Sequence, residues 1–156
     1  MDWKGDEGRM GQLCQLFQLA SSPDNSVQQQ VMQMLTQFSQ LPDFNMYLAT
    51  VFAKMTNQEE VVRQRAGLLL KTNVARAQPG TLPPAVAEYV QAHTLLALRD
   101  SSKVIRHTAG TVISILVLKV GILGSRQTLD QLAGCLADPN QDVVEGSFNA
   151  LNKICE

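Results

Sequence analysis

The chain has 156 residues, with 13 basic and 14 acidic side chains and a formal net charge of −1. A near-neutral chain lacks the basic excess that binding to nucleic acid or to an anionic membrane surface requires, so neither is expected as a partner. Its three cysteines, at wide spacings, fit neither a disulfide framework nor a metal site, which indicates a reducing compartment. The longest apolar stretch is too short to cross a bilayer and the N-terminus has no signal-peptide core, so we expect a soluble intracellular protein.

Apolar side chains recur at three- and four-residue spacing along most of the chain, and no stretch alternates as a strand does, which predicts an all-α fold. Polar segments rich in helix-capping residues divide the chain into eight helices. In the first half we expect helices over about 8–20, 26–39 and 42–55, and a fourth that follows residues 56–59 and ends near residue 76. After a break rich in proline and glycine, we expect helices over about 84–98, 102–120, 127–137 and 141–156.

The second helix of each pair carries a recurring pattern. At an offset of 43 residues, one segment overlays another: Val62-Arg63-Gln64-Arg65-Ala66-Gly67 on Ile105-Arg106-His107-Thr108-Ala109-Gly110. The equivalent valine of the last pair is Val144, 39 residues after Ile105, and that of the first pair is Val27, 35 residues before Val62. Helix pairs that repeat every ~35–45 residues are typical of α-solenoids, in which each pair buries its apolar face only by stacking on its neighbours. The pattern of Asp, four residues, Val or Ile, Arg, two residues and Ala resembles the HEAT repeat.

We therefore predict an α-solenoid of about four HEAT repeats, with eight antiparallel helices stacked as a right-handed superhelix. The repeats are expected over about 8–41, 42–80, 83–121 and 125–156. Within such a stack, Asp100 is expected to cap a helix or bond to the neighbouring turn, and Arg63 and Arg106 to reach the loop of the adjacent repeat. These three residues are interpreted as structural.

Nothing in the sequence indicates catalysis. The two histidines, His93 and His107, lie on separate predicted helices, and neither has a cysteine at a useful spacing. Gly121 and Gly124 fit no phosphate-binding loop, because no strand precedes them and no Gly-Lys-Ser/Thr follows. We therefore expect a protein that is not an enzyme and that holds no cofactor and no metal.

A binding surface is better supported, on the face of each second helix opposite its buried residues. In an α-solenoid the second helices line up on the concave wall, so equivalent positions form a ladder across the repeats. The positions are Gln29, Met32, Gln33 and Thr36; Gln64, Gly67, Leu68 and Lys71; His107, Gly110, Thr111 and Ser114; and Gly146, Asn149, Ala150 and Lys153. Glycine recurs mid-helix at Gly67 and Gly110, where it costs ~1 kcal/mol relative to alanine. Either close helix packing or close approach of a partner backbone offsets that cost. Met32 and Leu68 are expected to be exposed apolar residues of an interaction patch.

Longer blocks of the sequence resemble a known family. Residues 41–48 (Leu-Pro-Asp-Phe-Asn-Met-Tyr-Leu) and 66–74 (Ala-Gly-Leu-Leu-Leu-Lys-Thr-Asn-Val) are similar to the N-terminal domain of importin-β-type nuclear transport receptors. Met1-Asp2-Trp3, Val104-Ile105-Arg106 and the closing residues 145–156 resemble the transportin (karyopherin-β2) branch of that family. The resemblance covers essentially all 156 residues in order.

The resemblance implies a particular function. Members of this family carry cargo through the nuclear pore and release it on binding Ran-GTP, and the second helices of their first repeats contact the switch regions of Ran. We therefore expect the ladder to bind Ran-GTP without touching the nucleotide itself. Cargo and nucleoporins are expected to bind through downstream repeats that are not in this chain, and the receptor to shuttle between cytoplasm and nucleus.

The residues also allow an interpretation from another class. A static HEAT scaffold, such as a phosphatase or vesicle-coat subunit, has the same repeat and binds no GTPase. In either case Phe148, Leu151 and Ile154 form an apolar helix face near the end of the chain without a polar capping repeat. We therefore expect an N-terminal piece of a longer protein, with surface that a following repeat would bury.

Overall fold

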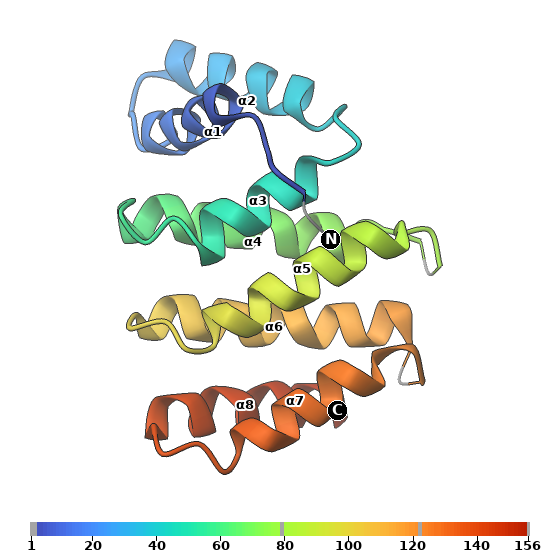
Figure 1. Ribbon diagram of the computed structural model, residues 1–156. Helices are drawn as coiled ribbons and strands as arrows, with labels where there is room; N and C mark the ends of the chain where they lie inside the picture. Colours follow the sequence, from blue (N-terminus) through green and yellow to red (C-terminus); the bar gives the residue numbers. More distant parts are fainter. Residues whose placement is uncertain (1–2, 79, 122, 156) are drawn as a thin grey trace.

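The computed structural model describes residues 3–78, 80–121 and 123–155. Over these residues the chain forms eight α-helices, one short 3-10 turn and no strand (Figure 1). The elements are α1 (Glu7–Leu19), α2 (Asn25–Phe38), α3 (Phe44–Ala53), α4 (Glu60–Arg76), α5 (Pro84–Ala97), α6 (Lys103–Val120), η1 (Leu123–Ser125), α7 (Arg126–Cys135) and α8 (Gln141–Cys155). The predicted all-α HEAT-repeat solenoid is confirmed. Met1, Asp2, Pro79 and Glu156, which parts of the sequence interpretation used, lie outside the described residues.

Local sequence sets the ends of several helices. The side chains of Asp6 and Asp24 accept hydrogen bonds from backbone N–H groups at 2.9 and 2.8 Å, which satisfies donors left free at the starts of α1 and α2. Pro84 is the first residue of α5, where its missing N–H is not needed. Gly121 follows α6 with a φ of 94°, a conformation that a side chain would strain. Because such signals act over a few residues, the predicted and observed helices agree closely.

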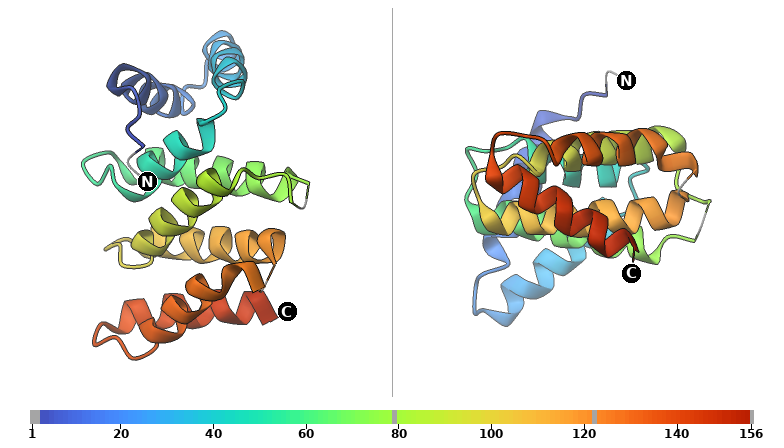
Figure 2. Two further views of the ribbon diagram at one scale, coloured as in Figure 1. Left: turned by 45° about the vertical axis from the view of Figure 1, so that its right-hand side comes forward. Right: turned by 90° about the horizontal axis from the view of Figure 1, so that it is seen from below.

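The last three helix pairs form two layers. The second-helix layer consists of α4, α6 and α8, which lie side by side, and the first-helix layer consists of α3, α5 and α7 (Figures 1 and 2). Phe52, Leu70, Ile105 and Leu116 are fully buried and come from successive pairs. They belong to one continuous hydrophobic cluster, so each pair completes its core only by stacking on the next.

Charged residues connect successive pairs at one end of the stack. Arg63 on α4 forms an ion pair with Asp100, in the loop before α6, and both side chains are buried. Asp100 also accepts a hydrogen bond from the backbone N–H of Ser102 at 2.9 Å. Arg106 on α6 donates to the carbonyl oxygen of Asp100 at 2.8 Å and lies 3.5 Å from the carboxylate of Asp142 on α8. The structural roles predicted for Arg63 and Asp100 are thus confirmed, and Arg106 reaches the first turn of the next second helix.

The first pair does not continue the row of second helices. Of the two helices of the first pair, α1 packs against α4, whereas α2 packs chiefly against α1. Seen from below, α2 runs obliquely to α4, α6 and α8 and projects beyond them (Figure 2). The side chain of Arg65 on α4 bonds to Ser21 Oγ at 2.8 Å, so the end of α1 occupies the place that a stacked second helix would take. The predicted ladder across four second helices is therefore wrong at α2.

The start of α8 also differs by one residue from the sequence overlay. The fully buried valine there is Val143, whereas Val144 is only half-buried. Val143 follows Ile105 by 38 residues, the same interval that separates Asp138 from Asp100. Because the buried face fixes the rotation of the helix, α8 is turned by one position relative to the predicted register.

Candidate functional site

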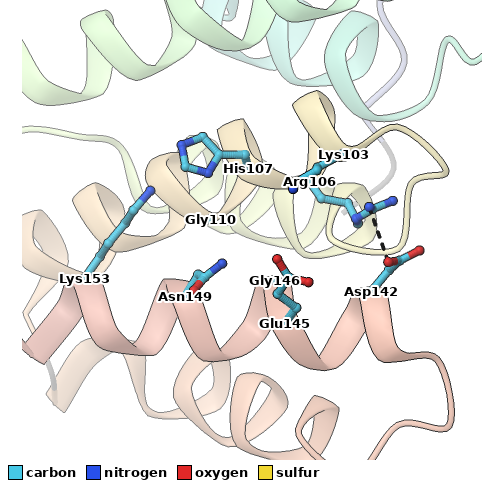
Figure 3. A pocket seen from close by; sticks show the side chains of 9 residues that line it. All are labelled: Lys103, Arg106, His107, Gly110, Asp142, Glu145, Gly146, Asn149 and Lys153. Carbon is cyan, nitrogen blue, oxygen red and sulfur yellow. Dashed lines mark ion pairs between the residues drawn. The ribbon is translucent and has the colours of Figure 1, made fainter.

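A groove lies between α6 and α8 in the second-helix layer (Figure 3). It is lined by Lys103, Arg106, His107, Gly110, Asp142, Glu145, Gly146, Asn149 and Lys153. Its cavity volume of about 40 Å³ is far below the ~300–1,000 Å³ of a typical small-molecule pocket. The groove is therefore a notch in a larger surface, suited to a side chain of a partner protein rather than to a bound cofactor.

Helical spacing brings these residues together. On α6, Arg106 and His107 each lie three or four residues from both Lys103 and Gly110, so the four share one face of the helix. On α8 the side chains of Asp142, Glu145, Asn149 and Lys153 point toward α6 (Figure 3). At the floor of the groove Gly110 of α6 lies next to Gly146 of α8, and a Cβ on Gly110 would stand 3.8 Å from the carbonyl oxygen of Gly146, an ordinary van der Waals distance.

The groove carries charges of both signs. Arg106 and Asp142 form an ion pair across it at 3.5 Å (Figure 3), and Lys153 Nζ donates to Thr111 Oγ1 at 2.7 Å. Lys103 and Glu145 take part in no ion pair within the described ranges. An arrangement with free charges of both signs recognises a partner surface with a complementary pattern rather than a uniformly charged polymer.

Of the predicted ladder, the structure gathers the α6 and α8 positions. His107, Gly110, Gly146, Asn149 and Lys153 line the groove, and Thr111 holds Lys153. Two other members of the predicted ladder on these helices, Ser114 and Ala150, are buried.

The predicted α4 positions lie on the neighbouring helix of the same layer. Leu68 is 42% exposed, Gln64 and Lys71 are half-buried, and Gly67 is buried. The four α2 positions are all exposed, and Met32 is 70% exposed, but they stand on the helix that leaves the row: Gln29, Met32, Gln33 and Thr36.

The two mid-helix glycines have different surroundings. A Cβ on Gly67 would lie 2.5 Å from the ring of Phe52 and 3.0 Å from Thr108 Cγ2, so close packing between α4 and its neighbours requires this glycine. A Cβ on Gly110 would meet nothing closer than Ala150 Cβ at 3.6 Å, an ordinary contact. Helix packing thus explains Gly67, whereas Gly110 is not required by it.

Sequence reasoning missed several charged residues of the groove. Lys103, Asp142 and Glu145 were not among the predicted positions, and Arg106 was assigned a structural role only. Their signal was present in the spacing, since Asp142, Glu145 and Asn149 recur at three- and four-residue intervals on one face. That α6 and α8 turn these faces toward each other follows only from their packing.

The two histidines lie apart and have different environments. His107 is exposed on α6, whereas His93 on α5 is buried and its ring stacks on Tyr89. Burial lowers the pKa of His93 below its ordinary value, which favours the neutral ring.

Across the described residues there is no group of three or more His, Cys, Asp or Glu side chains placed to hold a metal ion. In the same residues, no helix has both the length and the apolar composition needed to cross a bilayer.

Two family models match parts of the chain. Residues 31–100 match the model described as importin-beta N-terminal domain. Residues 69–156 match the model described as non-SMC mitotic condensation complex subunit 1. The importin-beta match begins within α2, the other match begins within α4, and the two overlap over residues 69–100.

Individual relatives match the chain from end to end. Transportin-1 of Homo sapiens is 37% identical over 155 residues, and Transportin-1 of Oryza sativa subsp. japonica is 39% identical over 154 residues. Importin subunit beta-2 of Schizosaccharomyces pombe is 29% identical over 156 residues. Each match covers 99% of this chain but only 17% of the relative, so the chain spans about a sixth of the length of the curated relatives that it matches.

Proposed function

The chain belongs to the transportin branch of the importin-β family of nuclear transport receptors, and from this we propose that it is the N-terminal, Ran-GTP-binding part of a nuclear import receptor. The observation that supports the proposal most directly is the second-helix layer. There α4, α6 and α8 lie side by side, and the groove between α6 and α8 presents free charges of both signs. A layer of this kind offers a globular partner one continuous surface.

The proposed contacts are surface contacts. Three neighbouring helices supply them: an apolar group from Leu68, a cation from Lys71, an imidazole from His107 and an amide from Asn149. In this proposal the partner's switch segments distinguish GTP from GDP by their conformation, and this chain recognises that conformation by shape and hydrogen bonds. The exposed face of α2, with Gln29, Met32, Gln33 and Thr36, extends the surface beyond the layer.

The remaining parts of the function lie outside this chain. We infer that cargo and nucleoporins bind through repeats downstream of it, and that the receptor moves between cytoplasm and nucleus. We further infer that the protein is not an enzyme, because the relatives that it matches are named transportins and an importin subunit.

A binding assay with a matched pair of variants tests the proposal. Biolayer interferometry measures the affinity of the chain for Ran loaded with GTP or with GDP. We expect binding to the GTP form only, and at least ~10-fold weaker binding for Asn149→Arg, which places a bulky cation in the groove. Gln131→Arg on α7 is the control, because Gln131 is exposed in the first-helix layer and does not line the groove, and we expect the affinity for Ran to be unchanged.

The rival function is a HEAT scaffold that binds no GTPase, such as a phosphatase or vesicle-coat subunit. The match of residues 69–156 to the condensation-complex subunit model favours keeping it, because a subunit of that kind is described as part of an assembly. Equal binding of both nucleotide forms, or binding of neither, supports the scaffold and contradicts the proposal.

A further inference from the structure

A second and larger cavity lies in the first-helix layer, away from the groove between α6 and α8. It is formed by α5, α7 and the segment before α1, and it has a volume of about 640 Å³. An adjoining cavity of about 410 Å³ shares the lining residues Ala92, Leu95 and Gln131 with it. Together the two form an elongated cleft along α5 and α7, a shape that suits an extended chain better than a compact ligand.

One wall of this cleft holds an unpartnered hydrogen-bond acceptor. His93 is only 7% exposed, its ring stacks on Tyr89 with centroids 3.9 Å apart, and its Nδ1 lies 2.8 Å from the carbonyl oxygen of Tyr89. Because a carbonyl oxygen can only accept, Nδ1 carries the proton and Nε2 of the neutral ring has a lone pair. Nε2 has no partner within the described part of the chain.

An unpartnered donor lies in the same lining. Gln91 Oε1 accepts a hydrogen bond from Thr128 Oγ1 at 3.2 Å, while the buried amide Nε2 of Gln91 has no partner among the described residues. A buried polar group without a partner is unfavourable, so a ligand that supplies one is bound more tightly. The complement of one acceptor and one donor is an N–H group together with a C=O group, which is the content of a peptide bond or a carboxamide.

Charge and aromatic contacts define one end of the cleft. Lys4 and Lys54 line it, and neither forms an ion pair with any residue that the structure describes. Among the described residues of the lining Glu88 is the only acidic side chain, so these residues together give the cleft a net positive charge. Trp3 packs edge-on against Tyr89 with ring centroids 5.1 Å apart, and its indole Nε1 donates to Asp43 at 3.0 Å, which holds it as part of the wall.

The other end of the cleft is apolar. Leu95 and Leu96 line the adjoining cavity, and Leu96 is 52% exposed. The cation in this part of the lining, Arg99, is already paired with Asp138 at 2.8 Å. This end therefore suits an aliphatic side chain.

We propose that the cleft between α5 and α7 binds an extended, acidic peptide segment of a partner protein. The segment places an acidic side chain beside Lys4 and Lys54 and an aliphatic side chain against Leu95 and Leu96. Its N–H and C=O groups bond to His93 Nε2 and Gln91 Nε2 once the side chains that cover these two buried atoms move aside. Its charge requirement and its position on the first-helix layer make this site independent of the proposed Ran surface.

The test uses the 156-residue chain and synthetic peptides. Three pools of fluorescein-labelled peptides are used, each peptide about nine residues long and ~30 Å when extended. At the charged positions the first pool has aspartate and glutamate, the second has serine and the third has lysine. Leucine and asparagine are varied at the other positions. Fluorescence polarisation measures their affinity. We expect the acidic pool to bind at least ~10-fold more tightly than the serine pool, and the lysine pool not to bind.

Variants locate the binding. Lys54→Glu, which changes an exposed side chain, is expected to weaken the acidic pool at least ~10-fold, and His93→Phe, which keeps the stacked ring and removes the acceptor, is expected to do the same. Lys103→Glu in the other layer is the matched control and is expected to leave the affinity unchanged. If the acidic pool binds no better than the serine pool, or if Lys54→Glu binds it as the unmodified chain does, the proposal is wrong. Should His93→Phe fail to fold, Lys54→Glu still decides the outcome.

Discussion

The first helix pair and the three pairs that follow have the same helical period but differ in how they hold their neighbours. In the stacked pairs, Arg63 on α4 reaches Asp100 of the next repeat and forms a buried ion pair. The corresponding residue of α2 is Gln28, whose side chain instead donates to the carbonyl oxygen of Ser22 in its own loop at 2.8 Å. Asn57 stands where the next repeat has Asp100, so the junction between the first and second pairs lacks both the arginine and the aspartate.

A second position shows the same difference. Gly67 is buried against Phe52 and Thr108, while the residue in the same register of α2 is Met32, which is 70% exposed. The close contact with Phe52 and Thr108 requires glycine at this position of α4, whereas the exposed position on α2 accepts a long side chain. The comparison teaches that α4 is held by an arginine–aspartate pair and a closely packed glycine that α2 lacks, and that helical periodicity alone does not distinguish these two helices.

The largest expected effect is at the ion pair. Asp100→Ala leaves Arg63 buried without its partner, which should lower the free energy of unfolding by about 3–5 kcal/mol. The matched change in the first pair, Gln28→Ala, removes one exposed hydrogen bond and should cost less than ~0.5 kcal/mol. Urea unfolding followed by circular dichroism measures both, and similar losses for the two variants would remove the distinction between the pairs.

A smaller effect is expected at the glycine position. Gly67→Ala pushes a methyl group into Phe52 and Thr108, and such overpacking should cost about 1–3 kcal/mol. Met32→Ala on α2 should change the free energy of unfolding by no more than ~0.5 kcal/mol, because that side chain is exposed. Gly110→Ala serves as the internal control. Its Cβ meets only ordinary contacts, so the better helix propensity of alanine should raise stability by about 0.5–1 kcal/mol. A stabilising Gly67→Ala would contradict the packing argument.

The smallest effect concerns pH. Burial lowers the pKa of His93 below its ordinary 6.5, and the positive charge of Lys54 at the end of α3 lowers it further. The other charged groups among the described residues of the same cavity are Lys4 and Glu88. The unfolded chain therefore binds a proton more readily than the folded chain. It follows that the contribution of neutral His93 to the free energy of unfolding is complete above about pH 6.5. This contribution is lost as the pH falls through the lower pKa that His93 has in the folded chain.

His93→Phe should remove this part of the decline in stability below pH 6.5, because phenylalanine takes up no proton. Thermal unfolding of the chain and the variant at a series of pH values measures the difference between their slopes. The first pair contains no histidine, so the effect belongs to the stacked part of the molecule. Parallel slopes for the two proteins would show that His93 does not contribute.

The candidate groove was only partly predictable. His107 and Asn149 were identified from the repeat, because equivalent positions recur at a fixed interval along the chain. Lys103 and Glu145 were missed because the overlay compared each helix with the next and did not ask which faces meet between them. The peptide cleft had no signal in the sequence, since it joins Trp3 to Tyr89 and His93.

The amino-acid sequence by itself determined where the helices begin and end, that they come in pairs, and that the pairs must stack. Those properties follow from the spacing of apolar residues and from caps such as Asp6 and Asp24, which act within one turn. Tertiary structure alone decided that α1 rather than α2 covers α4, and that α8 is turned by one residue. These outcomes depend on contacts between residues about forty or more positions apart, such as Arg65 with Ser21, whose free energies depend on how whole helix faces fit together.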